Sequence, residues 1–435
     1  MGVEPDKDSA YVAVIGLGYV GLPLAASLAA AGTRVVGIDT DARVRDAARA
    51  GRPLLREPGI PELLAGLDDG RLTFRDTLPD ELPRAVIVCV GTSPDAGSDR
   101  PNLRHVEAAI DMIAPSVTDD CVVIVRSTVP VGTCRKSVLP RLRARTPRPL
   151  LAFCPERTIQ GTSLAELHSL PQIVGGLDER SAEAASALLA PVMPDRITVS
   201  SMEAAELAKL VCNAHTDLIY GFGNEIALIA EGHALDANEV INAANLRYPR
   251  PDISRPGYVG GSCLVKDPFM LIQAAREAGH HAPMVAAARE INELVPSHAV
   301  TRVVTELERR GRPLADATVL VCGIAYKGRP ETDDVRGSAA AVVQAQLAGR
   351  VARLLGHDFV VTPERITAMG LDPTPLMDGL RKADVVLLLS DHPRYVHDDI
   401  AAALTSSPVV FDMWGLWQEQ LADAAGIAYL RLGRG

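Results

Sequence analysis

The chain has 435 residues, a length that suggests about three domains. Apolar residues make up 47% and charged residues 23%, which excludes a wholly disordered or fibrous chain. The net charge is -10, from 44 Lys and Arg against 54 Asp and Glu. An acidic chain without a basic block disfavours binding to nucleic acid or to an anionic membrane surface.

Targeting and redox signals are few. No run approaches the roughly 20 apolar residues of a membrane span, and residues 1–10 lack a signal-peptide pattern. The seven cysteines form no CxxC pair, so we expect neither a metal site nor a disulfide framework. The expected compartment is a reducing cytoplasm.

The first predicted domain, residues 1–200, alternates short apolar runs with helical patterns. Buried parallel strands are predicted at residues 11–15, 34–39, 85–90, 121–125 and 150–153. The spacing leaves room for crossover helices, so we expect an open α/β sheet.

A glycine-rich turn follows the first of these strands. In Gly16-Leu-Gly-Tyr-Val-Gly21, Gly16 permits a tight turn, Gly18 lets the backbone approach a pyrophosphate, and Gly21 lets helix and strand pack closely. The helix that begins there presents free N–H groups to the phosphates. Asp39 would accept hydrogen bonds from the adenine ribose and repel a 2′-phosphate, which favours NAD over NADP. The alternative is a glycine-rich turn in a nucleotide-free domain.

Polar residues also end two later strands of this sheet. Thr92 follows one strand, and Ser127 and Thr128 follow the next. Ligands of doubly wound folds bind at this edge, although Ser and Thr are equally typical of helix N-caps.

The second predicted domain, residues 201–310, is helical, with a Pro/Gly-rich interruption at residues 248–261. One face of its first helix is polar and almost uncharged, and consists of Lys209, Asn213, Thr216, Tyr220 and Asn224. The opposite arc is apolar, and consists of Leu210, Val211, Ala214, Leu218, Phe222 and Ile226. We expect the polar face to line a cavity or interface, and the apolar arc to pack against a second copy in a homodimer. A solvent-exposed polar face and an internal partner for the arc are the alternatives.

Cys263 follows two glycines and precedes a predicted helix. Glycines allow close approach of a ligand, and a helix N-terminus favours a thiolate. The alternative is a buried, inert thiol, which we expect for the other six cysteines.

The third predicted domain, residues 311–435, begins with the linker Gly311-Arg-Pro313. Strands are predicted at residues 318–322, 384–389, 408–411 and 427–430. The expected fold class is therefore α/β, with two Rossmann-like parallel-sheet domains joined by a central helical domain with a long helix.

Several motifs occur in the order of a known family. They are Gly16–Pro23, Ser127–Gly132, Cys154–Arg157, the helix with Lys209 and Asn213, Gly260–Cys263, Lys266-Asp267, Ala325–Lys327 and Thr332–Arg336. From end to end the chain resembles the UDP-glucose/GDP-mannose dehydrogenase family. Residues 154–161 and 171–176 are similar to its UDP-N-acetyl-D-mannosamine dehydrogenase-like branch. Ser262 stands where many members of that branch have His, and Met413-Trp414 where many have Arg.

The resemblance implies an NAD-dependent, four-electron oxidation of C6 of a nucleotide sugar, a UDP-hexose or UDP-N-acetylhexosamine, to a uronic acid for polysaccharide biosynthesis. It implies six catalytic residues: the nucleophile Cys263, the oxyanion donors Lys209 and Asn213, the general base Glu156, and the water-positioning Asp267 and Thr128. The implied cofactor-binding residues are Gly16, Gly18, Tyr19, Val20, Gly21, Asp39, Arg43, Thr92, Ser127, Thr128 and Arg336. The implied substrate-binding residues are Glu156, Arg157, Thr158, Lys209, Asn213, Arg250, Gly261, Tyr326 and Lys327.

Two other functions remain open from the sequence. A two-electron dehydrogenase of the hydroxyacid or 6-phosphogluconate type would need Lys209 and Asn213 but not Cys263. A non-catalytic regulator that binds NAD or a sugar nucleotide would need no nucleophile, and the complete set of Cys, Lys, Asn and Glu argues against it.

Overall fold

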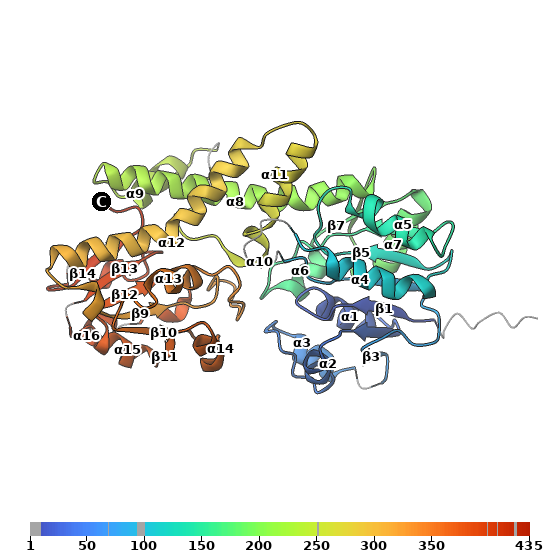
Figure 1. Cartoon of the computed structure of the whole chain (residues 1–435), viewed down its shortest axis with the longest axis horizontal. Helices are drawn as coiled ribbons and strands as arrows, with labels where there is room; N and C mark the ends of the chain where they lie inside the picture. Colours follow the sequence, from blue (N-terminus) through green and yellow to red (C-terminus); the bar gives the residue numbers. More distant parts are fainter. Residues whose placement is uncertain are drawn as a thin grey trace, which may run out of the picture. The chain divides into compact units, whose positions relative to one another are not determined.

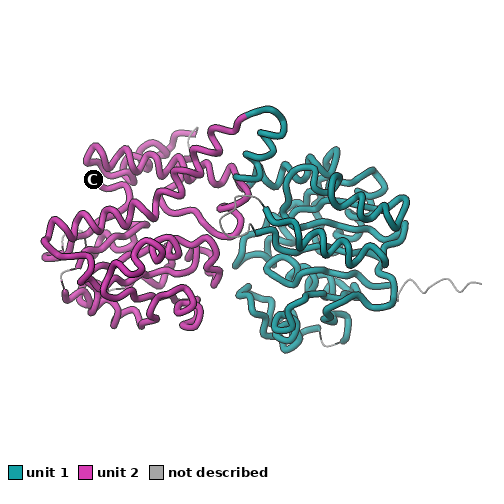
Figure 2. The backbone as a smooth tube through the Cα atoms, in the orientation of Figure 1, with its two compact units in different colours: residues 1–212, 269–280 teal, residues 213–268, 281–435 magenta. Residues whose placement is uncertain are grey.

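The computed structural model describes residues 10–67, 69–93, 101–249, 252–397, 399–406, 408–421 and 424–435 (Figure 1). The chain forms two compact units, residues 1–212 with 269–280 and residues 213–268 with 281–435 (Figure 2). Helix α8 (Met202–Gly232) begins in the first unit and ends in the second. The division into three domains at residues 200 and 310 stays a prediction.

The first unit contains an eight-stranded sheet with the order β3-β2-β1-β4-β5-β6-β7-β8. Its strands are β1 (Val12–Ile15), β2 (Val35–Ile38), β3 (Leu72–Arg75), β4 (Ala85–Val88), β5 (Val122–Val125), β6 (Leu150–Phe153), β7 (Gln172–Gly176) and β8 (Arg196–Val199). All neighbours are parallel except β6 and β7. Its helices are α1 (Gly21–Ala30), α2 (Ala42–Arg49), α3 (Ile60–Ala65), α4 (Arg104–Ile113), α5 (Leu139–Arg143), α6 (Ser163–Ser169) and α7 (Glu179–Leu189).

The five strands predicted for this sheet are confirmed. Each is a wholly buried apolar run, as a parallel strand covered on both faces requires. The sequence did not indicate β3, β7 and β8. Both β3 and β8 are edge strands with several exposed residues, so they lack a continuous apolar run, and β7 ends in two glycines.

The second unit contains a six-stranded parallel sheet with the order β11-β10-β9-β12-β13-β14. Its strands are β9 (Thr318–Cys322), β10 (Arg353–His357), β11 (Asp372–Pro373), β12 (Val385–Leu388), β13 (Val409–Asp412) and β14 (Ala428–Arg431). Its helices after β9 are α13 (Ala339–Leu347), α14 (Pro363–Ala368), α15 (Leu376–Lys382), α16 (Ile400–Ala403) and α17 (Gln418–Leu421). The four predicted strands are confirmed, so the chain has the expected fold class.

The helices that follow α8 and precede β9 in the sequence also belong largely to the second unit. They are α9 (Ala237–Asn245), α10 (Gly261–Leu264), α11 (Asp267–Glu277), of which residues 269–277 lie in the first unit, and α12 (Pro283–Arg309). Helix α12 packs beside α13 and against β13 (Figure 1). Its buried Val295, Ala299 and Val303 join the core that contains Val319 and Val321 of β9.

Both sheets have the same anchored turn after their first strand. The residue that follows β1 is Gly16, at φ 90°, and the one that follows β9 is Gly323, at φ 88°, a left-handed region that favours glycine. The next N–H in each turn donates to an Asp that ends the neighbouring strand: Leu17 to Asp39 at 2.9 Å, and Ile324 to Asp358 at 2.8 Å.

Candidate active site

The glycine-rich turn has the features of a dinucleotide site. A Cβ at exposed Gly18 would meet no atom within 4 Å, whereas a Cβ at Gly21 would lie 1.8 Å from the Gly16 carbonyl oxygen. Helix α1 begins after Tyr19 and Val20 with no side-chain cap and no acidic residue in its first turn. The helix N-terminus and the open space at Gly18 fit a pyrophosphate.

Asp39 follows β2 beside this turn. Its Oδ2 accepts from the Leu17 N–H at 2.9 Å, and its Oδ1 accepts from the Asp41 N–H at 2.9 Å. Each oxygen retains capacity to accept a ribose hydroxyl. Arg43, in the first turn of α2, forms an exposed ion pair with Asp41 at 2.6 Å.

The loops after β4 and β5 are tied together. The Thr92 hydroxyl donates to the Thr128 carbonyl oxygen at 2.7 Å, and the Ser127 hydroxyl donates to the Val88 carbonyl oxygen at 3.3 Å. These polar side chains therefore fix the strand ends next to the glycine-rich turn, at the edge where ligands of such sheets bind.

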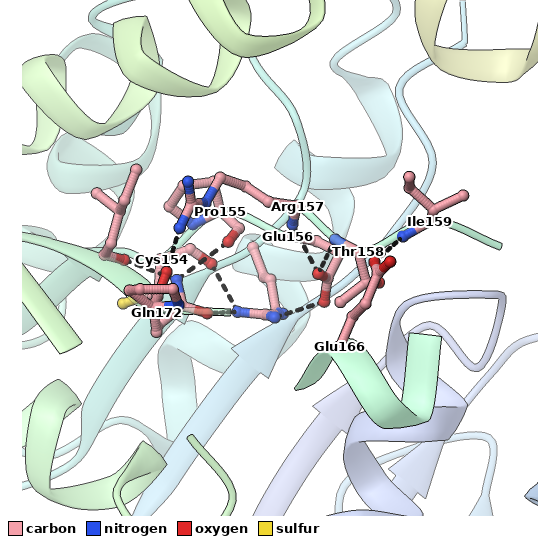
Figure 3. A network of polar contacts seen from close by, with 11 residues as sticks. Cys154, Pro155, Glu156, Arg157, Thr158, Ile159, Glu166 and Gln172 are labelled. Carbon is pink, nitrogen blue, oxygen red and sulfur yellow. Dashed lines mark hydrogen bonds and ion pairs between the residues drawn. The ribbon is translucent and has the colours of Figure 1, made fainter. Parts of the chain in front are cut away.

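A buried polar network surrounds Glu156 (Figure 3). The Arg126 guanidinium forms an ion pair with Glu156, and on its other side donates to the Gln172 amide oxygen at 2.6 Å and the Cys154 carbonyl oxygen at 3.1 Å. The main-chain N–H groups of Arg157 and Thr158 both donate to Glu156 Oε1, at 2.6 and 2.7 Å. The carboxylate is thus held on both oxygens.

The partners of Glu156 decide its protonation state. Burial by itself raises the pKa of this carboxyl, but the Arg126 charge, the Thr158 N–H and the Lys209 charge together hold the pKa below its ordinary value. Glu156 is therefore ionised at neutral pH. A lowered pKa also makes it a weaker base than an unpaired carboxylate.

Helix α8 carries Lys209 and a second buried acid. Glu206 accepts from the main-chain N–H groups of Gly132 at 2.5 Å and Cys134 at 2.9 Å, which ties α8 to the loop after β5. Lys209 lies one turn further along the helix and is buried. Asn213 follows four residues later, on the same helix face.

In the second unit, Asn213 and Asp267 are in contact. The Asn213 amide donates to Asp267 Oδ2 at 2.5 Å, and the Lys266 ammonium donates to Asp267 Oδ1 at 2.5 Å. Asp267 is wholly buried, so its charge is balanced by one cation and one amide.

Cys263 lies in the short helix α10, and its side chain is exposed. This exposure contradicts the alternative of a buried, inert thiol. Five other cysteines are buried as expected, and burial raises the pKa of Cys89, Cys121 and Cys154 to about 12. The expectation was wrong for Cys212, which is exposed because it lies on a face of α8 that the chain leaves uncovered.

Three predicted substrate residues meet in the second unit. A Cβ at Gly261 would lie 2.7 Å from the ring of Tyr326, so the ring packs directly on this residue. The Lys327 ammonium lies 5.5 Å from the centre of the same ring. Arg336, at the end of the same loop, pairs with Asp334 at 2.7 Å.

Trp414 is the second residue after β13. Its indole N–H donates to the Leu389 carbonyl oxygen at 3.0 Å. A Cβ at Gly257 would lie 2.2 Å from the ring, so the indole packs against the segment that leads to Cys263. Arg250, a predicted substrate residue, lies outside the described residues.

The sequence did not assign a role to Arg126 or Glu206, although both support candidate residues. The available signal for Arg126 was its place at the end of a buried strand, where a charge must be paired. Glu206 lies on the same helix as Lys209, but nothing local indicates that its partners are N–H groups more than 70 residues earlier.

Neither a metal cluster nor a membrane span is found in the part of the chain that the structure describes. No group of three or more His, Cys, Asp or Glu side chains there could hold a metal ion. Likewise, none of the helices in those ranges combines the length and the apolar character needed to cross a membrane.

The fold and the turn at Gly16 define a dinucleotide-binding protein built on two Rossmann-like sheets. Models of the NAD binding domain, central domain and UDP binding domain of the UDP-glucose/GDP-mannose dehydrogenase family match residues 10–193, 203–294 and 320–419. The chain therefore belongs to the UDP-glucose/GDP-mannose dehydrogenase family. It is an NAD-dependent oxidoreductase that oxidises a nucleotide sugar to a uronic acid.

Similar proteins cover almost the whole chain. An NDP-N-acetyl-D-galactosaminuronic acid dehydrogenase of Ralstonia nicotianae is 32% identical over 430 residues, which are 95% of this chain and 97% of that protein. The structure of a UDP-D-ManNAc dehydrogenase of Pyrococcus horikoshii superposes with a TM-score of 0.88 at 30% identity, over 98% of this chain and 99% of that one. A UDP-glucose dehydrogenase of Pyrobaculum islandicum gives a TM-score of 0.85 at 29% identity over the full length of both.

Proposed function

We propose that this enzyme oxidises C6 of a UDP-N-acetylhexosamine through a covalent intermediate on Cys263. The observation that carries the proposal is the exposed thiol on α10, four residues before the buried Asp267 with its Lys266 and Asn213 partners. The names of the Ralstonia and Pyrococcus proteins support an N-acetylated sugar. A UDP-hexose is the competing substrate, because Ser262, as in enzymes of the UDP-glucose type, stands where many members of the hexosamine branch have His.

The chemistry proceeds in three stages. NAD supplies the acceptor for a hydride from C6 in each of two oxidations. The alcohol first loses a hydride and a proton to become an aldehyde. The thiol of Cys263 adds to the aldehyde carbon, and the thiohemiacetal loses a second hydride and a proton to become a thioester. Water then adds to the thioester carbonyl, the C–S bond breaks, and the products are a carboxylic acid and the free thiol.

The remaining catalytic residues stabilise negative charge or activate and orient water. Lys209 and Asn213 donate hydrogen bonds to the oxyanions at C6, and their spacing of one helical turn supports a shared role. Glu156 accepts a proton from the attacking water, and Thr128 and Asp267 orient that water. The ion pair with Arg126 supports an ionised Glu156, the state that this role needs.

Binding residues form two sets in this proposal. The cofactor is held by Gly16, Gly18, Tyr19, Val20, Gly21, Asp39, Arg43, Thr92, Ser127, Thr128 and Arg336. The sugar nucleotide is held by Glu156, Arg157, Thr158, Lys209, Asn213, Arg250, Gly261, Tyr326 and Lys327. The NAD set lies mainly in the predicted domain 1–200, and the catalytic Lys209 and Cys263 lie in 201–310. The sugar-nucleotide set is spread over all three predicted domains, with Tyr326 and Lys327 in the predicted sugar-nucleotide-binding domain 311–435.

Stoichiometry and a cysteine pair test the proposal. Wild-type enzyme is expected to reduce two NAD per carboxylate, measured by absorbance and mass spectrometry with a panel of UDP-sugars. Cys263→Ala should form no carboxylate, and Cys263→Ser should accumulate a sugar-nucleotide ester, because an alkoxide leaves less readily than a thiolate. Cys212→Ala, at the other exposed cysteine, is the matched control and should keep full activity. One NAD per sugar, with an active Cys263→Ala, would select the two-electron alternative.

We also propose a homodimer through α8. Val211 and Phe222 of the predicted arc are 47% and 48% exposed, and Ile229, two turns after Phe222, is 53% exposed. Leu210 and Ala214 of the same arc are instead buried within the chain. An isologous contact between two copies would cover the exposed side chains. Phe222→Glu should lower the mass measured by light scattering from dimer to monomer at micromolar concentration, and a monomeric wild-type chain would contradict the proposal.

Cytoplasmic location and a role in polysaccharide biosynthesis complete the proposal. All seven cysteines are free thiols, which supports a reducing compartment. Cell fractionation with an antibody to the chain tests the location.

A further inference from the structure

A wholly buried polar network joins α8 and α12 in the second unit. The Asp217 carboxylate pairs with the Arg289 guanidinium at 2.8 Å and accepts from the Asn292 amide at 2.8 Å. The Asn224 amide donates to the Asn292 side-chain oxygen at 2.8 Å. None of these four side chains exposes more than 1% of its surface.

The network reaches one segment of main chain, residues 257–264, here called the cysteine segment. Asn224 binds Gly257 twice: its amide donates to the carbonyl oxygen at 2.9 Å, and its side-chain oxygen accepts from the N–H at 2.8 Å. Arg289 donates to the carbonyl oxygens of Val259 at 3.3 Å and Leu264 at 2.8 Å. Main-chain groups on both sides of Cys263 are therefore held by two side chains of the network.

The cysteine segment has little structure of its own to fix Cys263. Helix α10 has four residues and no side-chain cap, and a helix this short is unstable without tertiary contacts. No described residue of the segment pairs in a sheet. The position of the thiol relative to its surroundings therefore depends on contacts such as those from Asn224 and Arg289.

The chemistry of the network also favours a positioning role over a purely stabilising one. A buried ion pair costs desolvation, and well-packed apolar residues often replace such a pair without loss of stability. Here Asp217 Oδ2 is buried without a hydrogen-bond partner among the described residues, and Arg289 Nε makes no hydrogen bond there but lies 3.5 Å from Glu293 Oε1. The hydrogen bonds that Arg289 and Asn224 do make include those to the main chain of the cysteine segment.

We propose that Asn224 and Arg289 are positioning residues that hold the Cys263 thiol where it captures the C6 aldehyde. The inference rests on the proposed function of Cys263. When the segment is loosened, the aldehyde escapes before the thiohemiacetal forms. The enzyme then reduces more than two NAD per carboxylate, and free aldehyde appears in solution.

Two variants loosen the segment in different ways. Arg289→Lys keeps the charge opposite Asp217 but cannot reproduce the planar fork that reaches Val259 and Leu264. Asn224→Ala removes both bonds to Gly257 and leaves the ion pair intact. Asn245→Ala is the matched control, because Asn245 makes the same double contact with Ile253, at 2.8 and 2.9 Å, outside the cysteine segment.

The readout is a ratio, which does not depend on how much protein is folded. NADH is measured by absorbance, carboxylate by mass spectrometry, and aldehyde by a borodeuteride quench that marks C6 with one deuterium. Arg289→Lys and Asn224→Ala should lower kcat for carboxylate formation by about 10- to 100-fold. The KM for the UDP-sugar should stay within about threefold of the wild-type value. Their NADH-to-carboxylate ratio should exceed two, and deuterated alcohol should appear. Asn245→Ala should keep a ratio of two.

Each other outcome has an assigned meaning. Both variants with a ratio of two and no deuterated alcohol, at any activity, would overturn the positioning role, and so would failure of both to fold by circular dichroism. Loss of all turnover with unchanged circular dichroism and NAD affinity would also count against it, because the first oxidation precedes the step at Cys263. A wild-type ratio of one, or an active Cys263→Ala, would instead refute the proposed function and leave the network a separate matter.

Discussion

The two sheets share an anchored turn but use it differently. After β1, the turn at Gly16 leads within a few residues into α1, which begins at Gly21. After β9, the turn at Gly323 opens a long loop, and α13 begins only at Ala339. The first arrangement leaves main-chain N–H groups at a helix N-terminus, the kind of group that binds anions, whereas the second places side chains such as Lys327 in a loop. The length of chain after a shared anchor thus decides which kind of recognition is available.

Asp39 and Asp358 also differ in the number of main-chain N–H groups from which they accept hydrogen bonds. Asp39 accepts two main-chain N–H groups, those of Leu17 and Asp41. Asp358 accepts four, and these are the N–H groups of Ile324, Ala325, Val360 and Val361. The first acid is left with more capacity for a ligand, and the second acts chiefly on its own backbone.

The largest effect is expected where helix and turn touch. Gly21→Ala would place a Cβ 1.8 Å from the Gly16 carbonyl oxygen, so the backbone must move. We expect a loss of about 3 kcal/mol or more in the stability of the first unit, measured by calorimetry, and loss of NAD binding. Gly18→Ala has open space, and should change stability by less than about 0.5 kcal/mol while still weakening NAD binding. Equal destabilisation by both substitutions would contradict the close packing at Gly21.

The anchors themselves provide the next comparison. Asp358→Ala should lower the stability of the second unit by about 3 kcal/mol, and Asp39→Ala that of the first by about 1 to 2 kcal/mol, because four N–H groups lose a charged acceptor in one case and two in the other. Urea titration of both variants measures the difference. A larger loss of stability in Asp39→Ala than in Asp358→Ala would contradict the stronger structural role of Asp358.

Acid should weaken the second unit through His357. Burial lowers the pKa of this imidazole from 6.5 to about 4, although the neighbouring Asp358 opposes the shift. The unfolded chain then binds a proton between pH 6.5 and 4 that the folded chain does not. The resulting stability is complete above pH 6.5 and is lost as the pH falls toward 4. His357→Gln should remove about 3 kcal/mol of this pH dependence, and identical melting curves of the two proteins across this range would show that His357 titrates normally.

The smallest effect concerns cofactor choice. Asp39→Asn should reduce the preference for NAD over NADP about tenfold, since the repulsion of a 2′-phosphate is lost. Asp358→Asn should leave the preference unchanged if only the first sheet binds the dinucleotide. Kinetics with both cofactors test the pair, and a wild-type enzyme that uses them equally would remove the role of Asp39.

The sequence predicted what is local and periodic. Fully buried strands are visible as apolar runs, and Gly16 and Asp39 stand at the spacing that a dinucleotide fold requires. Asp358 was not predicted because the turn at Gly323 is not followed by the same glycine pattern, although its geometry is the same. Edge strands such as β8 were missed because exposure removes the apolar run.

The residues that hold the candidate site in place are harder to predict from the sequence. Asn224 stood out only as part of a polar helix face, and its partner Gly257 lies 33 residues away. Arg289 and its partner Asp217 are 72 residues apart on different helices. No local pattern connects such residues, because the contacts exist only after the helices have packed.

Trp414 and Trp417, the only tryptophans in the sequence, both follow β13. Trp417 is wholly buried, with its indole N–H on the Tyr395 carbonyl oxygen, whereas Trp414 is partly exposed against Gly257. The tryptophan fluorescence of the chain therefore originates in the second unit alone. Trp417 reports whether that unit is folded, and Trp414 reports the state of the cysteine segment. The sheet with the glycine-rich turn contributes no tryptophan emission to the same spectrum.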